Sequence, residues 1–103
     1  MHLYIGVRLR QLAADCWEAE APDLPASRTT GHSSGEALAR VRLALEGLIA
    51  ERLGRGDKLP EPRSLQQLQA GDDGPGDYYE IHINLRHLDA VARHQDGRWN
   101  PAR

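Results

Sequence analysis

The stretch that most constrains this fold reads PDLPASRTTGHSSGEALARVRLAL. Within it, Ser33 and Glu36 stand three residues apart just before an apolar run, which is the spacing of a helix capping box. Apolar residues then recur at three- and four-residue intervals and make one stripe: Leu38, Val41, Leu45, Leu48, Ile49 and Leu53. We therefore expect a helix over residues 34–54 that lays this stripe on a sheet and stops at Gly54 or Gly56.

The beginning of the chain alternates between apolar and polar side chains and predicts a β-hairpin. In residues 3–9 every second side chain is apolar, which is the period of a half-buried strand. Residues 13–21 read as the antiparallel partner, with Trp17 facing inward and Glu18 facing the opposite side. No Asn-Gly or Asp-Gly turn stands near residues 11–14, so the sequence leaves the pairing register open.

Two further strands complete the expected sheet. Pro22 and Pro25 carry no amide hydrogen and are expected to stop the hairpin pairing. Residues 27–30, rich in threonine, predict a short third strand. Residues 78–85 predict a fourth strand whose inward side chains are Tyr79, Ile81, Ile83 and Leu85. The predicted class is α+β with the order β-β-β-α-β, an antiparallel three- or four-stranded sheet covered on one face by a long helix and open on the other.

Turn-forming residues fill the connection between the helix and the fourth strand. Residues 55–77 contain the clusters LPEPRS and GDDGPGD, which we expect to be a proline-stiffened segment and a mobile loop. A single helical turn is expected at residues 64–68 between them. The sequence thus predicts one domain over residues 1–85, followed by a basic tail over residues 86–103 with room for a short helix.

The bulk composition excludes several classes of protein. A net charge of −2 gives no whole-chain attraction to nucleic acid. Cys16 is the single cysteine, so no internal disulfide is possible and a cytoplasmic location is the simplest expectation. No apolar run approaches the ~20 residues of a membrane span, and the N-terminus lacks the pattern of a signal peptide.

Four motifs occur in an order that resembles the HicB-like antitoxin family, and the resemblance covers residues 3–88. The family pattern runs through a Pro-Asp-Leu-Pro turn, a glycine before a Glu-Ala helix, an Ile-Pro-x-Pro-Ser segment and a last apolar strand. In this sequence the matching residues are Pro22–Pro25, Gly31 with Glu36 and Ala37, Leu59–Ser64, and Ile81–Leu85. The resemblance implies a partial ribonuclease-H-like fold. One departure is that Ala26 and Ser27 stand where the family has Gly-Cys.

The resemblance also implies a function in a bacterial toxin–antitoxin system. A domain of this kind would mask a small HicA-type, mRNA-cleaving toxin by steric occlusion and would self-associate as a dimer or tetramer. It would need no enzymatic activity and no cofactor. Family members commonly continue into a DNA-binding domain, for which this chain has no room, so DNA binding is not expected. The alternatives are a structural homo-oligomer without a toxin and a regulator that binds nucleic acid.

Two surfaces are candidates for a partner interface. The outer side of the predicted helix carries small and apolar residues where charge would be usual: Leu43, Gly47, Ala50 and Gly54. A glycine inside a helix costs ~1 kcal/mol relative to alanine. Small residues at these positions would let another helix or strand approach closely. The second surface is the polar face of the fourth strand, with Glu80, His82 and Asn84. A weaker candidate for nucleic-acid contact is the tail, through Arg93, Arg98 and Trp99.

No pattern indicates catalysis or a metal site. A metal-dependent nuclease needs converging carboxylates, and the available ones are scattered over a turn, a loop, a helix start and a strand: Asp15, Asp23, Glu36 and Glu80. The histidines at 82, 87 and 94 lack the spacing and supporting ligands of a zinc site. Cys16 lacks a nucleophile signature. We therefore expect no catalytic, cofactor-binding or metal-binding residue.

Overall fold

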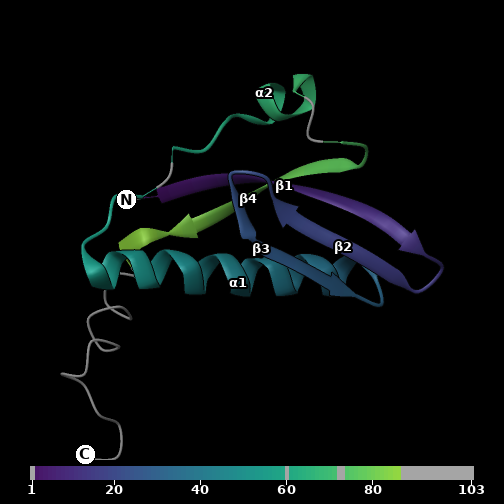
Figure 1. Ribbon diagram of the computed structural model, residues 1–103, viewed down its shortest axis with the longest axis horizontal. Coiled ribbons are helices and arrows are strands. Elements are labelled where there is room, and N and C mark those ends of the chain that lie inside the picture. Colours follow the sequence, from purple (N-terminus) through teal and green to yellow (C-terminus); the bar gives the residue numbers. More distant parts are fainter. Residues whose placement is uncertain (1, 60, 72–73, 87–103) are drawn as a thin grey trace, which may run out of the picture.

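The computed structural model describes residues 2–59, 61–71 and 74–86. In this part of the chain the elements are β1 His2–Ala13, β2 Cys16–Ala21, β3 Leu24–Gly31, α1 Ser34–Arg55, α2 Leu65–Ala70 and β4 Asp77–Asn84. The predicted α+β class is confirmed (Figure 1). The predicted domain end at residue 85 stays a prediction, and the tail helix lies outside the described residues. Neither α1 nor α2 is long and apolar enough to cross a membrane.

The four strands form one antiparallel sheet in the order β3-β2-β1-β4. The register that the sequence left open pairs Leu9 with Ala19, and it shifts at a bulge between Gln11 and Ala13. The hairpin turn therefore lies at residues 14–15, and β1 is longer than predicted. Because β1 lies between β2 and β4, the first strand of the chain is held on both of its edges.

Pro25 corrects one prediction. It was expected to stop pairing, but it lies inside β3, which already begins at Leu24. The reason is that β3 is an edge strand, and its register with β2 is irregular between Ala19 and Ala21. A missing amide hydrogen is tolerated at an edge or a bulge. Ser27 stabilises this irregular pairing, because its Oγ accepts a hydrogen bond from the buried amide of Ala21 at 2.9 Å.

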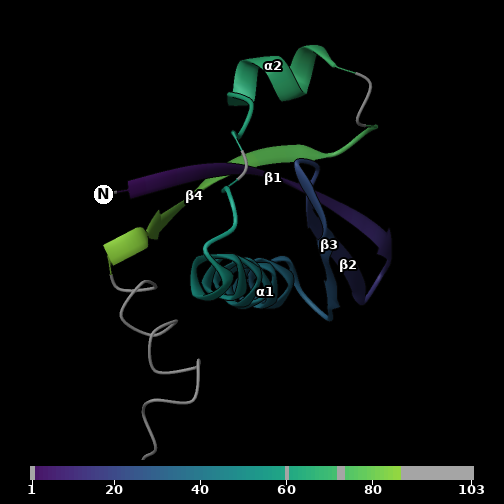
Figure 2. The same cartoon turned by 60° about the vertical axis from the view of Figure 1, so that its left-hand side comes forward.

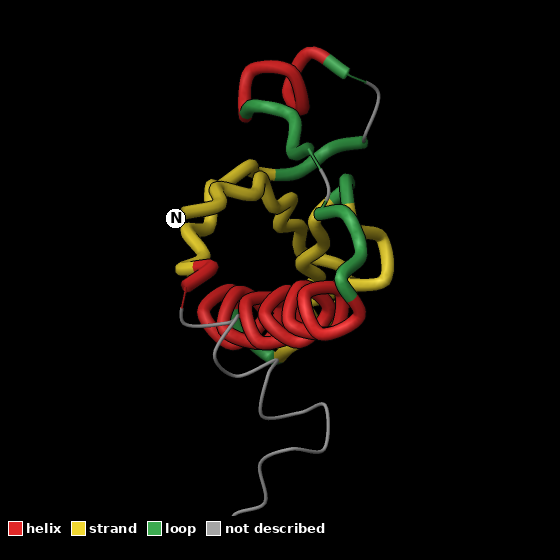
Figure 3. Tube along the Cα trace, turned by 90° about the vertical axis from the view of Figure 1, so that its left-hand side faces the viewer, coloured by secondary structure: helices red, strands yellow, loops and turns green. Residues whose placement is uncertain are grey.

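The hydrophobic core lies between α1 and the inner face of the sheet (Figure 3). The predicted helix stripe is confirmed at its centre, where Val41, Leu45 and Ile49 have no exposed surface. The sheet contributes a matching apolar layer: Ile5, Val7, Leu9, Ala19, Ala21, Ile81 and Ile83. Burying each large aliphatic side chain contributes about 1.5–3 kcal/mol relative to exposure. This one layer therefore accounts for most of the apolar stabilisation.

The ends of α1 are fixed by local hydrogen bonds. Ser33 Oγ accepts from the amide of Glu36 at 3.1 Å, as the capping box predicts, but the Glu36 carboxylate reaches back to the amide of His32 at 3.3 Å. At the other end the chain turns at Gly56, whose φ of 73° lies in the left-handed region that favours glycine. A hydrogen bond to Asp57, with a smaller contribution from Glu51, raises the pKa of the exposed Arg55.

Tyr79 is a second correction. It was predicted to face inward, but its side chain is 44% exposed. It lies on β4, an edge strand that has a neighbour on one side only, so a large ring there is covered less than the buried Ile81 and Ile83. Inward direction alone therefore does not bury a side chain at the edge of a sheet.

The outer face of the sheet is not fully open, contrary to the prediction. Helix α2 lies on the side opposite α1 (Figure 2). Its Leu68 has no exposed surface, and a Cβ added at Gly6 would collide with the Leu68 Cδ1 atom. The glycine thus lets α2 approach the β1 backbone closely. The predicted turn at residues 64–68 is confirmed and continues to Ala70.

Candidate partner-binding surface

The polar side chains of β4 form a row on the outer face of the sheet. Glu80, His82 and Asn84 are exposed at alternate positions, as predicted, while Ile81 and Ile83 point into the core. Within the described part of the chain, no hydrogen bond or ion pair involves the Glu80 carboxylate. The exposed Glu80 carboxylate can therefore be reached by another molecule.

His82 is the centre of a small cluster on this row. Tyr4 lies directly opposite it on β1, and the two rings stack with centroids 4.9 Å apart and an angle of 26°. His2 Nδ1 lies 2.6 Å from His82 Nε2. On the backbone, Arg42 of α1 donates a hydrogen bond to the His82 carbonyl at 2.9 Å. Tyr4 is 53% exposed, so the cluster presents an aromatic surface to solvent.

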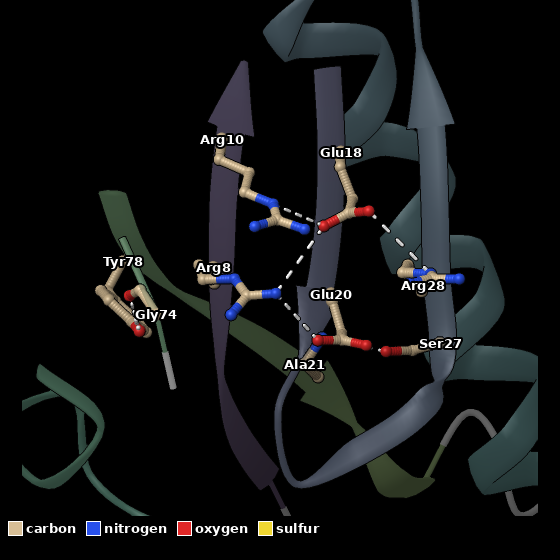
Figure 4. A network of polar contacts seen from close by, with 9 residues as sticks. All are labelled: Arg8, Arg10, Glu18, Glu20, Ala21, Ser27, Arg28, Gly74 and Tyr78. Carbon is tan, nitrogen blue, oxygen red and sulfur yellow. Dashed lines mark hydrogen bonds and ion pairs between the residues drawn. The ribbon is translucent and has the colours of Figure 1, made fainter. Parts of the chain in front are cut away.

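Farther along the outer face lies a network of arginine and glutamate side chains (Figure 4). Arg10 Nε contacts Glu18 Oε1 at 2.8 Å, and Arg8 contacts Glu20 at 3.2 Å. Glu18, only 5% exposed, also has Arg28 at 3.9 Å. These residues face each other across β1, β2 and β3, and the sequence pattern missed them because the pairing register was open. The side chains of residues 3–9 alternate between the two faces of the sheet. Knowledge of the register would therefore have been enough to predict that Arg8 lies opposite Glu20 and Arg10 opposite Glu18.

A carboxylate clamp joins two of the motifs that carry the family resemblance. Asp23, in the Pro-Asp-Leu-Pro turn, accepts hydrogen bonds from the amide and from Nε of Arg63, both at 2.8 Å. The two residues are 40 positions apart. The Asp23 carboxylate therefore anchors the proline-rich segment that leads to α2.

The predicted outer surface of the helix, which faces away from the sheet, is exposed in part. Leu43 is 69% exposed, and Gly47 and Gly54 are exposed as well. Ala50, however, is only 3% exposed, so its prediction as an outward-facing residue is wrong. Near its C-terminus α1 is covered over a wider arc than at its centre, because Arg52 and Leu53 are both half-buried. A methyl group such as that of Ala50 needs few neighbours to be covered.

The two predicted interface surfaces lie on opposite sides of the molecule. The β4 row is on the outer face of the sheet, whereas Leu43 and Gly47 lie on the exposed side of α1, which covers the inner face (Figure 2). Arg93, Arg98 and Trp99 lie outside the described residues, and their contact with nucleic acid stays a prediction.

The described residues show how the other candidate groups are used. Glu36 caps α1 and Asp23 holds Arg63, so neither belongs to a set of converging carboxylates. Cys16 borders a hollow of ≈ 170 Å³ together with His32 and Arg40. In residues 2–59, 61–71 and 74–86, no three His, Cys, Asp or Glu side chains are grouped so that they could hold a metal ion.

Two solved structures share the fold of this chain. The crystal structure of the N-terminal domain of the Burkholderia pseudomallei antitoxin HicB matches with a TM-score of 0.72 over 80% of this chain and 99% of that one, at 13% identity. The crystal structure of the Burkholderia pseudomallei antitoxin HicB matches with a TM-score of 0.75 over 85% of this chain and 67% of that one, at 16% identity. No family model and no curated protein matches the sequence. The predicted HicB-like fold is thus confirmed.

Proposed function

We propose that this chain is an antitoxin-like protein-binding module that masks a small HicA-type, mRNA-cleaving toxin by steric occlusion. The observation that carries the proposal is the fold. Its alignment with the N-terminal domain of an antitoxin covers 99% of that domain, with a TM-score of 0.72. The order of the four sequence motifs supports it independently. Masking of this kind needs a shaped surface and no nucleophile or metal.

The outer row of β4 is the surface that suits this task best. It combines an acidic side chain, Glu80, with an exposed aromatic ring, Tyr4, and it stays exposed although α2 packs on the neighbouring Gly6. Tyrosine is enriched in protein interfaces, and complementary charge steers association. A toxin that binds mRNA carries a basic surface, which complements the negative charge of this chain.

Co-expression tests the proposal directly. The partner to use is a small basic protein encoded beside this chain, and the readouts are relief of growth arrest and formation of a complex on gel filtration. We expect Glu80→Arg to abolish both, because it places a repelling charge on the interface. The matched control is Glu61→Arg, an exposed charge reversal in the segment between α1 and α2. The absence of a complex with the unsubstituted chain would refute the proposal, and equal loss in both variants would refute the assignment to β4.

Self-association through the helix is the second candidate function. Leu43 is the most exposed of the large apolar side chains in the described chain, and the glycine at 47 one turn away leaves space beside it. Such a surface favours close packing of a second helix. Light scattering after gel filtration should show a dimer or tetramer that Leu43→Arg converts to a monomer. If this variant still masks the toxin, the two functions use separate surfaces.

A further inference from the structure

His2 and His82 meet although they are 80 positions apart in the sequence. They lie at the same end of the adjacent antiparallel strands β1 and β4. The His2 Nδ1 and His82 Nε2 atoms are 2.6 Å apart, and the ring centroids are 4.6 Å apart. Both side chains are exposed, so solvent and small ions can reach them.

The surroundings hold the His82 ring in place. Tyr4 stacks on one side of it at 4.9 Å, and the register that pairs these two residues fixes their β-carbons across the strands. Arg42 fixes the backbone through its hydrogen bond to the His82 carbonyl. Ligands that project from strands and are supported by a second layer of contacts are better positioned than ligands on loops.

The distance between the two nitrogens is close to the distance that binding of one metal ion by both would require. In the absence of an ion, one imidazole donates its proton to the lone pair of the other. A metal ion bound to both nitrogens at about 2.0–2.1 Å with a tetrahedral angle would separate them by roughly 3.3 Å. Rotation of the exposed His2 ring suffices for this small opening, and no strand has to move.

We propose that His2 and His82 form a two-histidine site for a borderline divalent cation of the Zn²⁺, Ni²⁺ and Cu²⁺ class. Imidazole nitrogen suits these ions, whereas Ca²⁺ and Mg²⁺ require oxygen ligands. Among the described residues no third His, Cys, Asp or Glu completes a cluster, so water fills the remaining positions. The site is open and exchangeable, and Cu²⁺ binds most tightly of the three.

The bound ion would join the first strand to the edge strand of the sheet. An ion that binds only the folded protein stabilises it in proportion to the logarithm of its concentration above the dissociation constant. The site is independent of the antitoxin proposal, because it needs only the β1–β4 pairing.

Calorimetric titration of the full chain with ZnCl₂, NiCl₂ and CuCl₂ tests the site. We expect His2→Ala and His82→Ala each to weaken binding at least about tenfold, since each removes one of two ligands. His32→Ala is the matched control, an exposed histidine on another part of the fold. A double variant, His87→Ala with His94→Ala, controls for the remaining histidines. A second readout is the rise of the unfolding midpoint with added ion, which should disappear in His2→Ala.

Two results would overturn the proposal. One is the absence of binding by the unsubstituted chain. The other is binding that is not weakened in either His2→Ala or His82→Ala, whatever the control variants do. Circular dichroism identifies any variant that fails to fold, and His2→Ala is the safer of the two because its side chain is exposed at the start of β1.

Discussion

The two faces of the sheet are built by different chemistry. The inner face is one continuous apolar layer under α1. The outer face is divided into the His82 cluster, the contact of α2 with Gly6, and the arginine–glutamate network. Apolar burial is non-directional, so the inner face sets overall stability, whereas the outer face depends on individual contacts with defined geometry. The outer face can therefore change in sequence, and in function, while the fold is kept.

The largest expected effect belongs to the inner face. Leu45 has no exposed surface and lies at the centre of the stripe. Leu45→Ala should lower the free energy of unfolding by about 3 kcal/mol, through lost burial and the cavity left behind. Urea denaturation followed by circular dichroism measures it. A loss below ~1 kcal/mol would mean that the inner face is not the main source of stability.

The next effect tests whether the outer face contributes comparably. Glu18 is buried beside Arg8 and Arg10, and the Arg8 Nε atom is already buried without a hydrogen-bond partner. Removing the charge by Glu18→Gln should destabilise the protein by about 2 kcal/mol, less than for a fully buried pair because Arg10 is partly exposed. Glu20→Gln, whose carboxylate is more exposed, should have a smaller effect in the same denaturation experiment. Equal effects would contradict this account.

A smaller effect is expected where α2 meets the sheet. Gly6→Ala should cost about 1 kcal/mol, because the Leu68 side chain must move away from the new methyl group. Hydrogen exchange should increase in residues 65–70 and stay unchanged in α1. Combining the substitution with Leu68→Ala should give less than the sum of the two single effects, since the collision is removed. Strict additivity would show that the two residues do not interact.

The smallest effect has the opposite sign and lies on α1. Gly47 is exposed, and a Cβ added there would meet nothing within 4 Å. Gly47→Ala should therefore raise the free energy of unfolding by up to ~1 kcal/mol through helix propensity. The measurement should be repeated over a range of protein concentrations. Destabilisation that grows with concentration would place this glycine in a subunit interface.

The elements of the inner face could be predicted because their signals are local. The capping residues Ser33 and Glu36 are three positions apart, and the helix stripe repeats within one turn or two. The errors at Pro25 and Tyr79 have one cause, because the position of a strand at the edge of a sheet is not visible in its own residues. The edge position of β3 tolerates Pro25, and the edge position of β4 leaves the Tyr79 ring exposed.

The contacts of the outer face could not be predicted for a related reason. The pairing of Arg8 with Glu20 depends on the exact hairpin register, and no turn signal supplied it. Asp23 and Arg63 are 40 positions apart and share no periodic pattern. Both residues were visible as charged side chains, but only the folded chain brings them together.

The strand order has a consequence for co-translational folding. The first described strand, β1, obtains its second neighbour only when β4, the last described strand, has left the exit tunnel. Such distant pairing closes a long loop and is slow compared with local contacts. The surface around His82 therefore comes into existence last. A nascent chain whose β4 is still inside the exit tunnel cannot yet capture a partner there.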